Sequence, residues 1–169
     1  MNGGEGFAKV WNTPIKMRNF ARQIGWELQL GWELMKRSRV LAVDFDGTVV
    51  THMYPQIGKE ADDCVRVLKR VIEAGHRIVL WTCREDDPEG GKLNYLGKAV
   101  AWMYESGLSV DTVNDTRPQD DFRNPTGLRR KVLADCYIDD RNLGVPKKNG
   151  CVDWSWVEQK LEEEGWFDA

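Results

Sequence analysis

The sequence has little of what marks a zinc protein, a disulfide scaffold or a membrane protein. Its four cysteines, Cys64, Cys83, Cys136 and Cys151, include no CxxC pair and are too sparse for a secreted scaffold. No run of about 18 apolar residues occurs, and the N-terminus lacks the apolar stretch of a secretory signal. We therefore expect free, reduced cysteines within the core, a cytoplasmic location and no integral membrane contact.

A strong excess of positive charge is also missing. The 169 residues carry a net charge of −3, which argues against a dedicated nucleic-acid binder, and their number suits one domain with a sizeable core. The charge is uneven, because residues 1–40 hold seven Lys or Arg against three Glu. We place an internal boundary there and predict an N-terminal extension over 1–38 and a main domain over 39–169.

Residues 15–36 have the pattern of an amphipathic helix. Apolar side chains recur there at three- and four-residue steps, and Trp26 and Trp32 widen the apolar face. Three interpretations stay open for this helix. It covers the sheet of the main domain, it is a surface for an oligomer or another partner, or it lies on a membrane surface, which the neighbouring Lys and Arg would favour.

From Arg39 onward, short apolar runs alternate with amphipathic helical patterns. The predicted strands cover residues 40–45, 77–82, 108–113 and 134–139, and the predicted helices cover 59–74, 92–106 and 154–164. Such alternation predicts an α/β protein with a three-layer α/β/α, Rossmann-like fold. We expect a parallel sheet of about five strands, right-handed crossovers and helices on both faces.

Polar side chains follow the predicted strands at their carboxyl ends, where open parallel sheets bind ligands. Asp44 and Asp46 follow the first strand, Thr82 ends the second, and Asp139 and Asp140 follow the fourth. Converging carboxylates repel one another unless a hard divalent cation lies among them, and oxygen ligands suit Mg²⁺. The sequence therefore predicts a Mg²⁺ site at this edge of the sheet.

The same residues suit phosphoryl transfer. A cation and a lysine can hold a phosphate dianion, and a carboxylate in line can attack its phosphorus to give an aspartyl phosphate. A second carboxylic acid two residues further on, as Asp46 is from Asp44, can protonate the leaving oxygen and later activate water. Gly47 lets the backbone turn tightly beside the ligand. Together these groups could transfer a phosphoryl group to Asp44 and then to water.

Four short motifs stand in a fixed order along the chain. They are Asp44-Phe45-Asp46-Gly47-Thr48, Thr82 after an apolar run, Lys131, and Asp139-Asp140. In this order they resemble the motifs of the haloacid dehalogenase-like superfamily in its phosphatase form, over roughly residues 39–160. The resemblance implies that residues 39–169 are a catalytic domain of this type.

The resemblance also implies a role for each residue. Asp44 would be the nucleophile and a metal ligand, and Asp46 the general acid and base, with its backbone carbonyl on the metal. Thr82 and Lys131 would hold the transferring phosphoryl group. Asp139 would complete the Mg²⁺ site, with Asp140 assisting. We interpret the arginines near these motifs mainly as surface charges, of which one or two steer an anionic substrate: Arg84, Arg129, Arg130 and Arg141.

Members of this superfamily often carry a cap domain, and this chain has no room for one. Only about a dozen residues separate Asp46 from the next predicted helix, and the 48 residues between Thr82 and Lys131 are taken up by one helix, one strand and one loop. An open site suits a large substrate, such as a phosphorylated nucleic-acid end or protein, and it also suits a small metabolite or nucleotide if an oligomer partner supplies the lid. The alternative function is a binding or assembly module on the same scaffold, which uses the tryptophan-bearing helix at 15–36.

Overall fold

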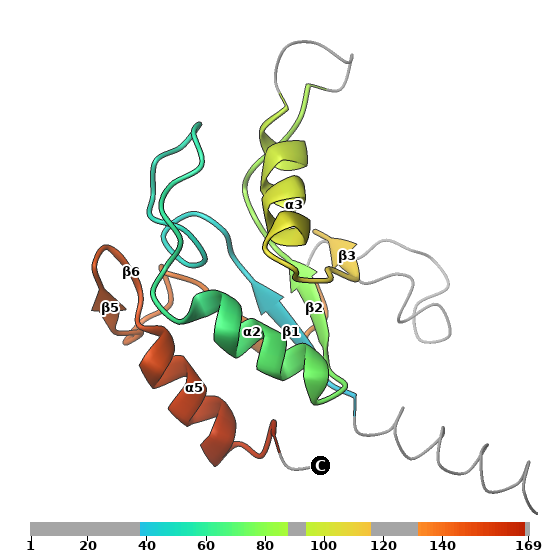
Figure 1. Ribbon diagram of the computed structural model, residues 1–169, viewed down its shortest axis with the longest axis vertical. Helices are drawn as coiled ribbons and strands as arrows, with labels where there is room; N and C mark the ends of the chain where they lie inside the picture. Colours follow the sequence, from blue (N-terminus) through green and yellow to red (C-terminus); the bar gives the residue numbers. More distant parts are fainter. Residues whose placement is uncertain (1–37, 88–93, 116–131, 168–169) are drawn as a thin grey trace, which may run out of the picture. The chain divides into compact units, whose positions relative to one another are not determined.

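The computed structural model describes residues 38–87, 94–115 and 132–167, which all belong to the unit Ser38–Ala169 (Figure 1). Its elements, in chain order, are β1 (Val40–Val43), α2 (Cys64–Glu73), β2 (Arg77–Leu80), α3 (Tyr95–Glu105), β3 (Thr112–Val113), β4 (Cys136–Ile138), β5 (Lys147–Lys148), β6 (Cys151–Val152) and α5 (Trp154–Glu163). None of the helices in these ranges has the length and apolar character needed to cross a membrane. The predicted helix at 15–36 lies outside the described residues.

A four-stranded parallel sheet with the order β3-β2-β1-β4 forms the centre of this unit. β1 pairs in register with β2, Leu41 opposite Ile78, and with β4, Leu41 opposite Cys136. In Figure 1 the arrows of β1 and β2 lie next to each other. The chain is therefore a mixed α/β protein, as predicted, and the described residues form four parallel strands where about five were expected.

Strand β1 forms because its four residues are all apolar, which suits a strand buried on both faces. Leu41 and Val43 lie in the core that the first face of the sheet shares with α2, α3 and α5. Val40 and Ala42 belong to a second cluster, with Trp81 and Tyr137 packed around it. All three described helices pack in the first core, on one face of the sheet. The expectation of helices on both faces therefore stays a prediction.

Helix α2 begins five residues later than the pattern predicts. The backbone of Lys59 accepts a hydrogen bond from Thr51, and Ala61 donates one to Val49, so residues 59–61 run beside the loop that follows β1. The helix ends at Glu73, and the predicted stop Gly75 follows two residues later with φ +84°. The segment before α2 is thereby used to fasten the loop that carries Asp46.

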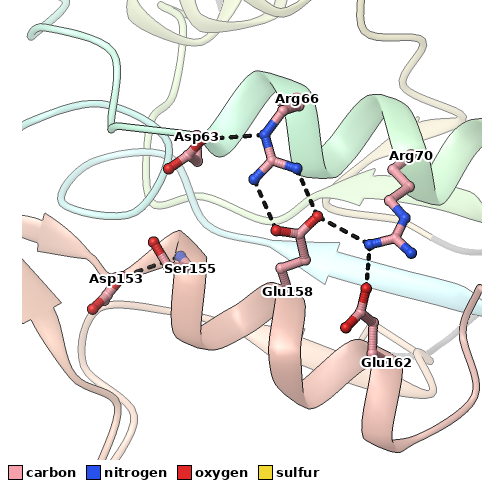
Figure 2. A network of polar contacts seen from close by, with 7 residues as sticks. All are labelled: Asp63, Arg66, Arg70, Asp153, Ser155, Glu158 and Glu162. Carbon is pink, nitrogen blue, oxygen red and sulfur yellow. Dashed lines mark hydrogen bonds and ion pairs between the residues drawn. The ribbon is translucent and has the colours of Figure 1, made fainter.

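Helices α2 and α5 are joined by charged side chains. Figure 2 shows Glu158 of α5 between Arg66 and Arg70 of α2. The N–O distances are 2.6 and 2.8 Å to Arg66 and 3.0 Å to Arg70. The pKa of Glu158 is lowered by these arginines, chiefly through the hydrogen bonds from Arg66. The network fixes how α5 lies along α2 on the first core.

The antiparallel pair β5-β6 is an element that the sequence analysis did not predict. Its turn is Asn149-Gly150, with φ values of +54° and +84°, which is the residue pair that two-residue hairpins favour. Val152 donates a backbone hydrogen bond to Gly47, 3.0 Å away. The hairpin therefore lies against the loop that follows β1.

Candidate active site

The polar residues at the strand ends meet at one cavity of about 350 Å³, as the parallel sheet requires. Asp44, Asp46, Thr82 and Asp139 all line it. Asp44 follows β1, and its backbone N–H is bound by Ile138 of β4, 2.9 Å away, so the ends of these two strands are held together. The sites predicted on separate strands thus belong to one place in the molecule.

Three carboxylates come close together in this place. Asp44, Asp139 and Asp140 each offer an oxygen, and these oxygens all lie within 4.8 Å of one another. A cluster of hard oxygen donors of this kind fits Mg²⁺, which prefers carboxylates and retained waters over nitrogen or sulfur. The donor set of the described residues thus suits the metal that the sequence predicts.

Thr48 connects the members of this cluster. Its hydroxyl donates to Asp44 Oδ2 and accepts the backbone N–H of Asp140, both at 3.0 Å. Its carbonyl accepts the indole N–H of Trp154 at 2.8 Å, and Thr48 itself is fully buried. The rotamer of Asp44 is therefore fixed through a buried residue that belongs to the same short motif.

The environment of Asp44 is unfavourable for a charge. The pKa of its carboxyl rises from 3.8 to about 6, chiefly because of burial and also because of the neighbouring Asp139 and Asp140, while hydrogen bonds from the Phe45 backbone and Thr48 act in the opposite direction. Like charges and desolvation both disfavour the ionised form. A cation among the three carboxylates would reverse this effect, which is a second reason for a metal at this site.

Asp139 and Asp140 each accept a hydrogen bond from a neighbouring residue. The backbone N–H of Arg141 donates to Asp139 Oδ1, and Lys147 Nζ donates to Asp140 Oδ2, both at 2.8 Å. A Cβ atom on Gly47 would lie only 2.8 Å from Asp140 Oδ2, so this approach requires glycine. Lys147 comes from β5, and sequence reasoning missed it because the hairpin was not predicted.

The backbone of Thr82 is fixed by Asn114, the residue that follows β3. Asn114 holds its backbone from both sides, accepting from Thr82 N at 2.8 Å and donating to Thr82 O at 2.9 Å. The Thr82 hydroxyl accepts the backbone N–H of Arg84 at 3.2 Å, which leaves its own hydrogen for a ligand. Lys131, the other predicted phosphoryl-binding residue, lies outside the described residues.

Two predictions about side chains near the cavity are wrong. Arg84 is not a surface charge, because its side chain is 1% exposed and pairs with Asp46 at 2.6 Å. Cys83 is not a core thiol, because it is exposed and lines the cavity, since β2 ends three residues earlier, at Leu80. The other three cysteines are free and buried or half-buried, as expected.

The fold and the site define a mixed α/β protein with an acidic cluster at the carboxyl edge of a parallel sheet. No protein-family model matches the chain, and no curated protein matches it. A solved structure from Bacteroides thetaiotaomicron, that of a conserved protein coded by a locus of this organism, is 36% identical, with a TM-score of 0.59, over 75% of this chain and 92% of that one. The chain belongs to the same family as this conserved protein, whose name states no activity.

Proposed function

We propose that the chain is a Mg²⁺-dependent phosphomonoester hydrolase of the haloacid dehalogenase-like type, without a cap domain. The observation that carries the proposal is the meeting of three carboxylate oxygens, from Asp44, Asp139 and Asp140, beyond the ends of β1 and β4. Such a cluster is costly without a cation, and its place at the carboxyl edge of the sheet is where α/β proteins bind their substrates.

The proposal assigns Asp44 as the nucleophile. Its carboxylate attacks phosphorus, the bond to the leaving oxygen breaks, and an aspartyl phosphate forms. Thr48 keeps the attacking group in one rotamer, through the hydrogen bond to Oδ2. The Thr82 hydroxyl, whose hydrogen is not used by Arg84, donates to the transferring phosphoryl group.

Mg²⁺ would be held by Asp44, Asp139 and Asp140 together with the backbone carbonyl of Asp46, and it would supply positive charge to the phosphoryl oxygens. Asp46 lies two residues after the nucleophile on the same cavity. It serves as the acid for the leaving group and as the base that takes a proton from the attacking water. Lys131 is proposed as a further phosphoryl ligand on the motif alone.

The test uses p-nitrophenyl phosphate with the full chain, with Mg²⁺ and after chelation. We expect turnover that needs Mg²⁺ and that Asp44→Asn reduces by a factor of roughly 10³ or more, because an amide is a poor nucleophile. Asp62→Asn removes an exposed carboxylate outside the cluster and is the matched control. A panel of phosphorylated metabolites, nucleotides and nucleic-acid ends would then identify the substrate class.

The metal site is tested separately from the activity. Mg²⁺ should raise the melting temperature of the wild type, and Asp139→Asn should remove this increase, because it takes one oxygen ligand and one charge from the cluster. A folded protein that binds Mg²⁺ at this cluster but hydrolyses none of the panel would contradict the phosphatase proposal. That result would favour the binding module instead.

A further inference from the structure

Arg84 is a buried arginine whose charge is matched by one carboxylate. Its side chain is 1% exposed, and that of Asp46 is 12% exposed. Nε donates to Asp46 Oδ2 at 2.6 Å and Nη2 donates to Oδ1 at 2.7 Å, so both carboxylate oxygens are bound in the fork geometry. A buried guanidinium charge is tolerated only when an opposite charge pairs with it, and the Asp46 carboxylate is that partner for Arg84.

The rest of the guanidinium is fixed by the loop after β1. Nη1 donates to the carbonyl of Pro55 at 3.1 Å, and Nη2 donates to that of Gln56 at 2.8 Å. The rings of Phe45 and Tyr54 lie 5.1 and 5.3 Å from the guanidinium carbon. The guanidinium is therefore held in one orientation, and through its two hydrogen bonds it also fixes the orientation of the Asp46 carboxylate.

Arg84 is among the residues that line the cavity, but its hydrogen-bond donors are mostly occupied, so a direct contact with substrate is a poor explanation for this arginine. A guanidinium has five N–H donors, and four of them are used by Asp46, Pro55 and Gln56. A phosphate-binding arginine would instead present two parallel donors to the cavity. Within the described part of the chain, Arg84 uses one lone pair on each Asp46 oxygen, and a carboxylate offers about four acceptor positions, so Asp46 can accept further hydrogen bonds.

We infer that Arg84 is a positioning residue, which holds the Asp46 carboxylate in the orientation needed to activate water in the second half of the reaction. The inference rests on the proposed function. In that step the water oxygen bonds to the phosphorus of the aspartyl phosphate, and the bond from phosphorus to the Asp44 oxygen breaks. The electron pair returns to the Asp44 carboxylate, the water proton goes to Asp46, and inorganic phosphate leaves.

The test separates the two halves of the reaction. p-Nitrophenolate is a good leaving group that departs without a proton, so formation of the aspartyl phosphate from p-nitrophenyl phosphate depends little on Asp46. Rapid-quench experiments with Mg²⁺ measure the burst of p-nitrophenol and the phosphate bound to the protein. For Arg84→Ala and Arg84→Lys we expect steady-state turnover to fall by roughly 10²-fold, the scale of one general base. The burst should persist and phosphorylated protein should accumulate.

Two controls distinguish positioning from a structural defect. Arg66→Ala removes an arginine that pairs with Glu158 away from the cavity, and it should cause no accumulation of phosphorylated protein. Ethylguanidine added to Arg84→Ala should restore dephosphorylation, whereas ethylamine should not, because only the planar fork binds both oxygens of Asp46. If Arg84→Ala does not fold, Arg84→Lys, checked by its melting curve, carries the comparison of burst with turnover.

The outcomes separate this inference from the proposed function. If the wild type hydrolyses the probe while the Arg84 variants either keep full turnover or lose the burst and the turnover equally, the positioning role is wrong and the phosphatase assignment stands. If the wild type gives neither turnover nor phosphorylated protein, both are wrong. Accumulation of phosphorylated Asp44 in the Arg84 variants, but not in Arg66→Ala, supports both.

Discussion

Replacing the proposed nucleophile should make the metal-free protein more stable at neutral pH, and this effect follows from the site geometry. Asp44 is largely buried beside Asp139 and Asp140, and the pKa of its carboxyl rises from 3.8 to about 6. Asp44→Asn keeps the shape and an acceptor for the Thr48 hydroxyl, but it has no charge to desolvate.

The sign and size of this effect depend on pH. With the folded pKa above the unfolded one, the native state binds the additional proton, so the favourable contribution of the protonated group is fully present below pH 3.8 and is lost as the pH rises through about 6. A pKa difference of this size corresponds to about 3 kcal/mol. Relative to wild type, Asp44→Asn should therefore gain little near pH 4 and up to about 3 kcal/mol near pH 8.

Urea unfolding in the presence of a chelator, at both pH values, measures the difference. Asp62→Asn is the control for the loss of one exposed carboxylate. Adding Mg²⁺ at pH 8 should stabilise the wild type far more than the variant, and it should reduce or reverse the difference in their free energies of unfolding. A variant that is less stable than wild type at both pH values, or a gap that does not grow with pH, would refute the account of Asp44 as a destabilised, buried carboxylate.

Three further substitutions test other parts of the site and its support. Gly47 has φ +85° and faces Asp140, so Gly47→Ala should cost roughly 1–2 kcal/mol of stability and abolish the melting-temperature increase with Mg²⁺. Its control is Gly75→Ala, at φ +84° with open space around it, which should lower stability but leave the Mg²⁺ effect unchanged. Trp154→Phe removes the indole donor from a buried carbonyl of the site loop and should cost about 1–3 kcal/mol by urea unfolding. Glu158→Gln should lower the melting temperature at neutral pH and much less below pH 4, because its lowered pKa contributes stability that is present above 4.5 and lost in acid.

The central part of the fold was predictable because its signals are local. Val40–Val43 and Arg77–Leu80 are short, continuous apolar runs, and α2 and α5 have clear apolar spacing, so the order of strands and helices follows from periodicity. A parallel sheet then places Asp44, Thr82, Asp139 and Asp140 at one edge without any knowledge of side-chain contacts.

The parts that were missed depend on contacts between distant segments. The burial of Arg84 results from the return of the loop at Pro55 and Gln56, 28 or more residues earlier in the chain, and no local pattern distinguishes this arginine from a surface one. Lys147 reaches Asp140 only because the Asn149-Gly150 turn makes a hairpin. That turn was recognisable from its two residues, although the strands beside it are too short to give a periodic signal.

The position of Cys83 makes the cavity accessible to thiol chemistry. Of the four cysteines it alone is exposed, while Cys64 and Cys151 are buried and Cys136 is half-buried with a pKa raised by burial. An alkylating fluorophore should consequently modify the native protein at one place, in the cavity that Cys83 lines together with Asp44, Asp46 and Asp139. A fluorophore on Cys83 would therefore report on ligand binding in the cavity. Its emission, or the rate at which it attaches, would change when any ligand occupies the cavity, whether or not that ligand is turned over.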